Sequence, residues 1–152
     1  MKNLDSIDMN ILKALQKNAR ITYRELSKKV NLTPPAVTER ILKLEELGIL
    51  IGYHACVDLQ ALGLGVASYI KMTVPHHKEK DLISFATDRP EVIECQAISG
   101  LSTFMLKVAL PSLEHLEAFT KELFTYGQTE NYIIMSDIIS RKEIVPQYDE
   151  GL

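Results

Sequence analysis

The chain has 152 residues, of which 46% are hydrophobic and 24% charged, an ordinary composition for a globular protein. This length allows one domain or two small ones, each with a buried core. No stretch approaches the ~18 apolar residues that a membrane helix needs, and the N-terminal MKNLDSID lacks a secretory apolar segment. We therefore expect a cytoplasmic protein without a membrane partner.

The net charge of −3 is distributed unevenly along the chain. Residues 1–58 contain nine Lys or Arg and seven Asp or Glu, for a charge of +2, whereas residues 59–152 carry −5. Between positions 13 and 43, eight basic residues accompany only two acidic ones, which gives a local charge of +6. Because phosphate binding depends on local clusters of positive charge, we expect the N-terminal third to bind nucleic acid.

Two short helices are predicted before residue 31, each with a capping residue at its start. Asp5 is a good N-cap for the first helix, whose buried stripe comprises Ile7, Ile11, Leu12 and Leu15. The second helix begins at Thr22, which forms a capping box with Glu25 in the sequence TYRE. Asn31 then tolerates the left-handed conformation that a tight turn requires.

The sequence of residues 31–48, NLTPPAVTERILKLEELG, predicts a third helix with both ends marked. Thr33 can cap the first turn, Pro34 suits the first helical position, and Gly48 suits a left-handed C-terminal end. One side has the spacing of a buried face, formed by Val37, Ile41 and Leu44. The opposite side carries mostly small or polar residues: Pro35, Ala36, Thr38, Glu39 and Lys43.

Capped helices joined by a short turn are typical of a helix-turn-helix, whose second helix enters the major groove of DNA. Taken alone, the third helix would better fit an ordinary amphipathic surface helix, and the basic segment around it favours DNA instead. The residues predicted to contact double-stranded DNA are Arg24, Lys28, Lys29, Thr33, Pro35, Thr38, Glu39, Arg40 and Lys43. Arg40 lies at the border of the buried face, so a structural ion pair and a phosphate contact both remain open for it.

The segment after Gly48, ILIGYHACVD, is rich in β-formers and predicts a strand or wing, and residues 60–65 read as a linker. Apolar alternation then predicts strands over residues 66–74, 92–99, 104–109 and 132–139. Helices are predicted over residues 78–87 and after a cap at Ser112. The order β-α-β-β-α-β is typical of a ferredoxin-like domain, so the fold class is α+β, with a winged helix-turn-helix first. The exposed face of such a sheet and its apolar last strand predict cover by a second subunit.

No catalytic, metal or cofactor site is expected. Cys56 and Cys95 lie far apart and fit no CxxC pattern, so we expect buried free thiols rather than a disulfide or metal ligands. His76 and His77 are adjacent and lack further ligands at helical or hairpin spacing. The chain also lacks a glycine-rich phosphate loop and a recognisable nucleophile motif.

Residues 4–58, from LDSID to HACVD, together with Leu62-Gly63 and the second half, resemble the Lrp/AsnC, or leucine-responsive, transcription regulators. The resemblance implies a winged helix-turn-helix over residues 1–58, a linker over 59–64, an effector-response and oligomerisation domain over 65–140, and a C-terminal tail over 141–152. It also implies a homodimer that assembles further, often into an octamer, and a nucleoid-associated location in the cytoplasm. The implied effector is an amino acid or a related small molecule.

In this family the turn between the second and third strands of the response domain commonly reads Gly-x-x-Asp and takes part in effector binding. Here the corresponding residues are Gly100, Leu101, Ser102 and Thr103. The aspartate that could pair with an amino acid's ammonium is absent, and Thr103 offers only a neutral hydroxyl. We therefore expect ordinary amino acids to bind weakly, or through other groups such as Glu94 or backbone carbonyls near Gly100.

Two other functions remain as alternatives. A small enzyme of amino-acid metabolism, or a stand-alone effector sensor, could be built on the ferredoxin-like half but would not explain the basic N-terminal third. A chromatin-organising protein with weak sequence preference would differ from a local repressor mainly in specificity. Failure of the purified protein to bind DNA would favour the enzyme or sensor.

Overall fold

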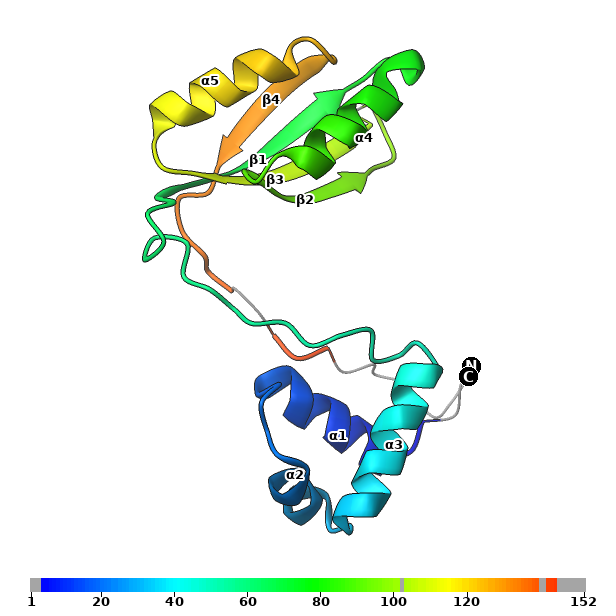
Figure 1. The fold of residues 1–152 in the computed structure, drawn as a ribbon. Coiled ribbons are helices and arrows are strands. Elements are labelled where there is room, and N and C mark those ends of the chain that lie inside the picture. The colour runs from blue at the N-terminus through cyan, green and yellow to red at the C-terminus, as the bar shows by residue number, and fades with distance from the viewer. Residues whose placement is uncertain (1–3, 102, 140–141, 145–152) are drawn as a thin grey trace. The chain divides into compact units, whose positions relative to one another are not determined.

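The computed structural model describes residues 4–101, 103–139 and 142–144, which divide into two units (Figure 1). The first unit takes in the chain up to Cys56 and the described residues from Ile139 onward, and the second runs from Val57 to Ile138. None of the helices in these ranges has the length and apolar character required to span a membrane. The predicted tail over residues 141–152 lies outside the described residues except for 142–144.

The first unit contains three helices: α1 (Ser6–Lys17), α2 (Tyr23–Val30) and α3 (Pro34–Glu46). Each begins at its predicted cap, because a side-chain oxygen accepts from an N–H of the first turn that has no partner within the helix. Asp5 accepts from the N–H groups of Ile7 and Asp8, and Thr33 accepts from Ala36. Thr22 and Glu25 form the predicted reciprocal capping box.

A small apolar core holds these helices together. Its buried members are Ile11, Leu15, Ile21, Leu26, Val30, Val37, Ile41 and Leu44. Full burial of one such side chain contributes about 1.5–3 kcal/mol, so the predicted apolar stripes account for much of the stability of this unit. Ser27 is also buried, and its hydroxyl donates to the backbone oxygen of Arg24 at 2.9 Å, which satisfies it inside the core.

Two predictions, one about the segment after α3 and one about the cysteines, differ from the structure. Residues 49–58 were expected to form a strand or a wing, and the strand is absent: these residues contain none, and in the described part of the chain no strand pairs with them. β-formers alone do not make a strand, because the backbone groups need a partner strand. Cys56 and Cys95 were expected to be buried and are both exposed, since Cys56 lies in this unpaired segment and Cys95 on an outer strand.

The second unit has the predicted order of elements. They are β1 (Val66–Thr73), the short 3₁₀ helix η1 (His76–Lys78), α4 (Glu79–Asp88), β2 (Val92–Ala97), β3 (Phe104–Leu110), α5 (Leu113–Leu123) and β4 (Gln128–Ile133). The four strands form one antiparallel sheet in the order β2-β3-β1-β4, with β1 and β3 in the centre. The α+β class with a β-α-β-β-α-β second half is confirmed.

Both helices of this unit cover the same face of the sheet, as Figure 1 also shows. The strands contribute Ile70, Met72, Phe104, Leu106, Val108 and Leu110 to the buried cluster, and Val74 joins it just after β1. The helices contribute Leu82 and Ala86 from α4, and Leu116, Phe119 and Leu123 from α5. Alternate residues of β1 and β3 therefore point to the core, as the period-two pattern predicted.

The prediction of the last strand was wrong in its limits. Residues 132–139 were expected to form it, whereas β4 is Gln128–Ile133 and begins with polar residues. Pairing with β1 sets these limits, because Gln128 lies opposite Thr73 and Ile133 opposite Ser68, near the start of β1. The N–H of Ile134 still donates to the Ala67 carbonyl of β1, but the described residues after it pair with no strand, and Met135 is 89% exposed.

The face of the sheet opposite the helices is amphipathic. Lys71 on β1 pairs with Glu130 on β4 at 3.0 Å, and the hydroxyl of Tyr132 donates to Glu130 at 2.6 Å. The ammonium of Lys107 lies 5.8 Å from the centre of the Tyr69 ring. This face combines aromatic surface with charges that are already paired within the chain.

Replacing Gly127 with Ala should destabilise the second unit by about 1–3 kcal/mol, because the added Cβ would overlap backbone atoms of Thr73 and Val74. Gly65→Ala is the matched control, since its Cβ would meet only the Pro111 carbonyl oxygen at 3.6 Å. Urea unfolding followed by circular dichroism measures the difference. Equal midpoints and slopes for the two variants would contradict the close approach at Gly127.

Candidate nucleic-acid interface

The helix-turn-helix consists of α2 and α3, which are joined through Asn31 in the left-handed conformation at a φ of 54°. Most side chains predicted to face DNA lie on its outside. The exposed ones are Arg24, Lys28, Lys29, Thr33, Pro35, Glu39 and Lys43, and Thr38 is half-buried. The two lysines at positions 28 and 29 occupy the last turn of α2, beside the start of α3.

The first turns of α3 present a compact polar surface. The Thr33 side chain is engaged in capping, at 3.4 Å from the N–H of Ala36. The hydroxyl of Thr38 donates to the backbone oxygen of Pro34 at 3.0 Å, which leaves its oxygen able to accept one further hydrogen bond. With Pro35 exposed between them, this end of the helix carries no long side chain to obstruct close approach to another surface.

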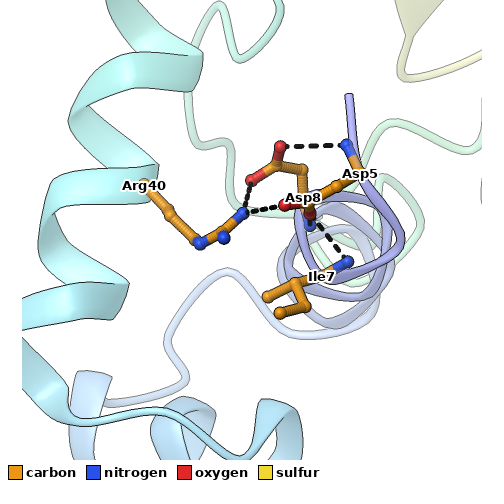
Figure 2. A network of polar contacts seen from close by, with 4 residues as sticks. All are labelled: Asp5, Ile7, Asp8 and Arg40. Carbon is orange, nitrogen blue, oxygen red and sulfur yellow. Dashed lines mark hydrogen bonds and ion pairs between the residues drawn. The ribbon is translucent and has the colours of Figure 1, made fainter. Parts of the chain in front are cut away.

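Arg40 faces inward toward α1 and forms the structural ion pair. Its Nη1 donates to a carboxylate oxygen of Asp5 and to one of Asp8, both at 2.7 Å. Figure 2 shows Arg40 reaching from α3 to the start of α1, where the two carboxylates meet. Of the two alternatives left open by the sequence, the structure shows the ion pair.

The same two aspartates form the capping box of α1. Asp5 accepts from the N–H of Asp8 at 2.8 Å, and Asp8 accepts from the N–H of Asp5 at 3.2 Å. The hydrogen bond from the Asp8 N–H and the guanidinium of Arg40 together lower the pKa of Asp5 below its ordinary value. The cap of α1 and the orientation of α3 are thus set by one network.

Two features of this unit were not predicted from the sequence. The hydroxyl of Tyr53 donates to Glu45 at 2.9 Å and ties the segment after α3 back to that helix. Burial, followed by the nearby Glu45 carboxylate, raises the pKa of Tyr53. Lys13 and Lys17 of α1 line a hollow of about 510 Å³ that Lys29 of α2 also lines. Their spacing of four residues on a helix was the available signal.

Comparison with known proteins assigns both halves of the chain. A family described as winged helix-turn-helix DNA-binding matches residues 4–51, and the Lrp/AsnC ligand binding domain matches residues 68–144. The chain is 38% identical to the HTH-type transcriptional regulator LrpC of Bacillus subtilis over 135 residues, which cover 89% of this chain and 94% of that protein. The chain belongs to the Lrp/AsnC family of transcriptional regulators. It is a DNA-binding regulator and not an enzyme.

Other relatives support this assignment over the full length. This Lrp/AsnC regulator is 30% identical to the leucine-responsive regulatory protein of Escherichia coli K12, over 95% of this chain and 92% of that protein. The solved structure of B. subtilis LrpC superimposes with a TM-score of 0.86 at 37% identity, covering 91% of this chain and 99% of that one. The predicted winged helix-turn-helix followed by a ferredoxin-like domain is confirmed at the level of the family.

In this Lrp/AsnC regulator, the turn predicted to bind the effector is joined to the end of β1. Thr103 donates its N–H to the Met72 carbonyl at 2.8 Å, and its hydroxyl oxygen accepts from the N–H of Val74 at 3.0 Å. Gly100 has a φ of 123°, a conformation that side chains rarely adopt, and Leu101 is 97% exposed. Ser102, the remaining predicted residue, lies outside the described residues.

Replacing Arg40 with Ala should lower the free energy of unfolding by about 1–3 kcal/mol at neutral pH, because the nearly buried Asp8 carboxylate loses a charged partner. The difference from wild type should narrow below about pH 4, since Asp5, whose pKa is lowered in the folded state, loses its stabilising contribution as the pH falls through that pKa. Thermal unfolding between pH 7 and pH 3 measures both effects. The exposed Arg20→Ala is the control, and an equal loss in that variant would contradict a specific role for Arg40.

Proposed function

We propose that α3 enters the major groove of double-stranded DNA with its first two turns toward the bases. In this arrangement Thr38, Glu39 and Lys43 face base edges or the adjacent backbone, and Thr33 and Pro35 allow close approach. Arg24, Lys28 and Lys29 on α2 bind phosphates. The observation that carries the proposal is the compact, exposed start of α3 beside the two exposed lysines of α2. Arg40 acts indirectly, by holding α3 against α1.

We propose that successive parts of the chain have different functions. Residues 1–58 bind DNA, residues 59–64 link, and residues 65–140 sense the effector and mediate assembly, with a C-terminal tail over 141–152. The basic charge of the first part and the matched ligand binding domain in the second support this division. Acting on chromosomal DNA, the protein would be associated with the nucleoid in the cytoplasm.

Replacing Lys28 and Lys29 together with Ala should weaken binding to all DNA sequences alike and reduce the slope of log K against log salt by about two. Each lysine that neutralises a phosphate releases about one counterion, and this release sets the slope. Fluorescence anisotropy with a labelled duplex at several salt concentrations measures it. The control is the double variant Lys80→Ala with Lys121→Ala, which removes the same charge from the second unit and should leave the slope unchanged. An unchanged slope in the variant that lacks Lys28 and Lys29 would exclude those two lysines from the interface.

We propose further that the protein is a homodimer that assembles into a larger particle, an octamer in the family pattern. Apolar side chains that face water in the single chain support this: Ile51, Val57, Met135, Ile138 and Ile139. These side chains lie in segments outside the helices and strands that are rich in β-forming residues, which suits pairing with a second copy. The amphipathic sheet face, with Tyr69 and Tyr132, offers further surface of the kind found in interfaces.

Light scattering at micromolar concentration should therefore show a dimer or a larger particle. Replacing Met135 and Ile138 with Asp should shift the population toward smaller species, because charged side chains are costly at a desolvated contact. Leu113→Asp, at an exposed position in the first turn of α5, is the control and should not change the mass. A stable wild-type monomer would contradict the proposal.

For the effector, we propose that Gly100, Leu101, Ser102 and Thr103 border the site and that ordinary amino acids bind there weakly. An ammonium in a closed site needs a strong acceptor, and the Thr103 oxygen already accepts from Val74. Glu94 is the alternative acceptor. One of its carboxylate oxygens lies 3.6 Å from the ammonium nitrogen of Lys107, and the other accepts from the side-chain amide of Gln96 at 3.3 Å, so its charge is partly satisfied. The match to a ligand binding domain supports an amino acid or related small molecule as effector.

Thr103→Asp should increase the affinity for leucine and similar amino acids by about tenfold or more, since a charge-assisted hydrogen bond contributes about 1.5–3 kcal/mol. One oxygen of the new carboxylate can keep the bond to Val74 while the other meets the ammonium. Calorimetry of wild type and variant against a panel of amino acids measures this. Thr103→Asn, which adds bulk without charge, is the control. Tight wild-type binding that the aspartate does not improve would place the ammonium elsewhere.

A further inference from the structure

The C-terminal segment is hydrogen-bonded to α1 of the DNA-binding unit. The side-chain amide of Gln16 donates to the backbone oxygen of Ile144 at 3.2 Å, and its oxygen accepts from the Ile144 N–H at 2.8 Å. One side chain thus satisfies both backbone groups of a single residue, as a neighbouring strand would. Two hydrogen bonds in this arrangement fix both the position and the direction of the segment along α1.

Next to this contact the segment places an acidic side chain among basic ones. Glu143 lines the hollow of about 510 Å³ that Lys13 and Lys17 of α1 and Lys29 of α2 also line. Three lysines and one glutamate therefore line the same small volume. A carboxylate within about one Debye length of these lysines, about 8 Å at physiological salt, reduces their positive potential.

We propose that residues 142–144 form an autoinhibitory strap, which docks on α1 through Gln16 and sets Glu143 against the lysines that attract DNA. Lys29 belongs both to the hollow and to the proposed phosphate-binding flank, so the strap and DNA compete for it. The competition, though not the docking, rests on the proposed DNA interface. Release of the strap strengthens DNA binding, because the flank then presents its full positive charge to the phosphates.

Docking is tested first without DNA, on the full-length protein. Amide hydrogen exchange of Ile144 should be about three- to tenfold faster in Gln16→Ala than in wild type, because the protecting acceptor is removed. Gln60→Ala, at an exposed position outside this contact, is the control and should exchange at the wild-type rate. Equal exchange of the Ile144 amide in wild type and Gln16→Ala would overturn the strap.

Competition is tested by DNA affinity. Gln16→Ala and Glu143→Gln should each bind a labelled duplex about two- to fivefold more tightly than wild type at low salt, and the gain should vanish at high salt. The control Glu46→Gln makes the same charge change at another exposed site of this unit. The gain in DNA affinity from Glu143→Gln must be larger than the gain from Glu46→Gln. Faster Ile144 exchange without a gain in affinity would overturn autoinhibition while leaving docking in place. A third outcome is that Ile144 exchange shows docking while the Lys28 and Lys29 replacements leave the salt dependence of DNA binding unchanged. That result would overturn the proposed DNA interface and leave the docking of the strap in place.

Discussion

The guanidinium of Arg40 joins helix α3 to the start of helix α1. Arg40 donates to Asp5 and Asp8 through one nitrogen, and these aspartates at the same time complete the capping box of α1. The start of α1 and the middle of α3 therefore cannot shift independently. Since the orientation of α3 determines which of its side chains can reach a groove, the proposed recognition of DNA by α3 depends on this ion-pair network.

The two units are stabilised in different ways, and this difference suits their functions. The first depends on caps and a small core, so its geometry is set locally and does not require a large domain behind it. The second depends on strand register across a four-stranded sheet, with α4 and α5 packed on one face. The turn before β3 is tied to the end of β1, because Thr103 is hydrogen-bonded to Met72 and to Val74, the residue that follows β1.

The charged residues are unevenly distributed along the chain and between the two units. Apart from Arg40, the basic residues between positions 13 and 43 are exposed. In the second unit, ion pairs such as Lys71 with Glu130 and Arg89 with Glu122 join residues of that same unit. The chain nevertheless returns to the first unit at residues 142–144, where Ile144 is hydrogen-bonded to Gln16. Such an arrangement allows the charge of the DNA-binding flank to be modulated from within the same chain.

The sequence by itself determined the helices of the first unit, because their signals are local. Caps such as Asp5, Thr22 and Thr33 act on N–H groups two or three residues away, and apolar spacing marks the buried faces. The order of elements in the second unit was determined in the same way, by period and by turn residues.

Only the tertiary structure decided features that depend on partners distant in sequence. The limits of β4 follow from its pairing with β1, so polar Gln128 belongs to the strand while apolar Met135 does not. Residues 51–58 form no strand because the described chain supplies no partner for them. The choice of Arg40 between Asp5 and a phosphate was likewise undecidable from its position on a helical wheel, because the carboxylates that hold it lie more than thirty residues away.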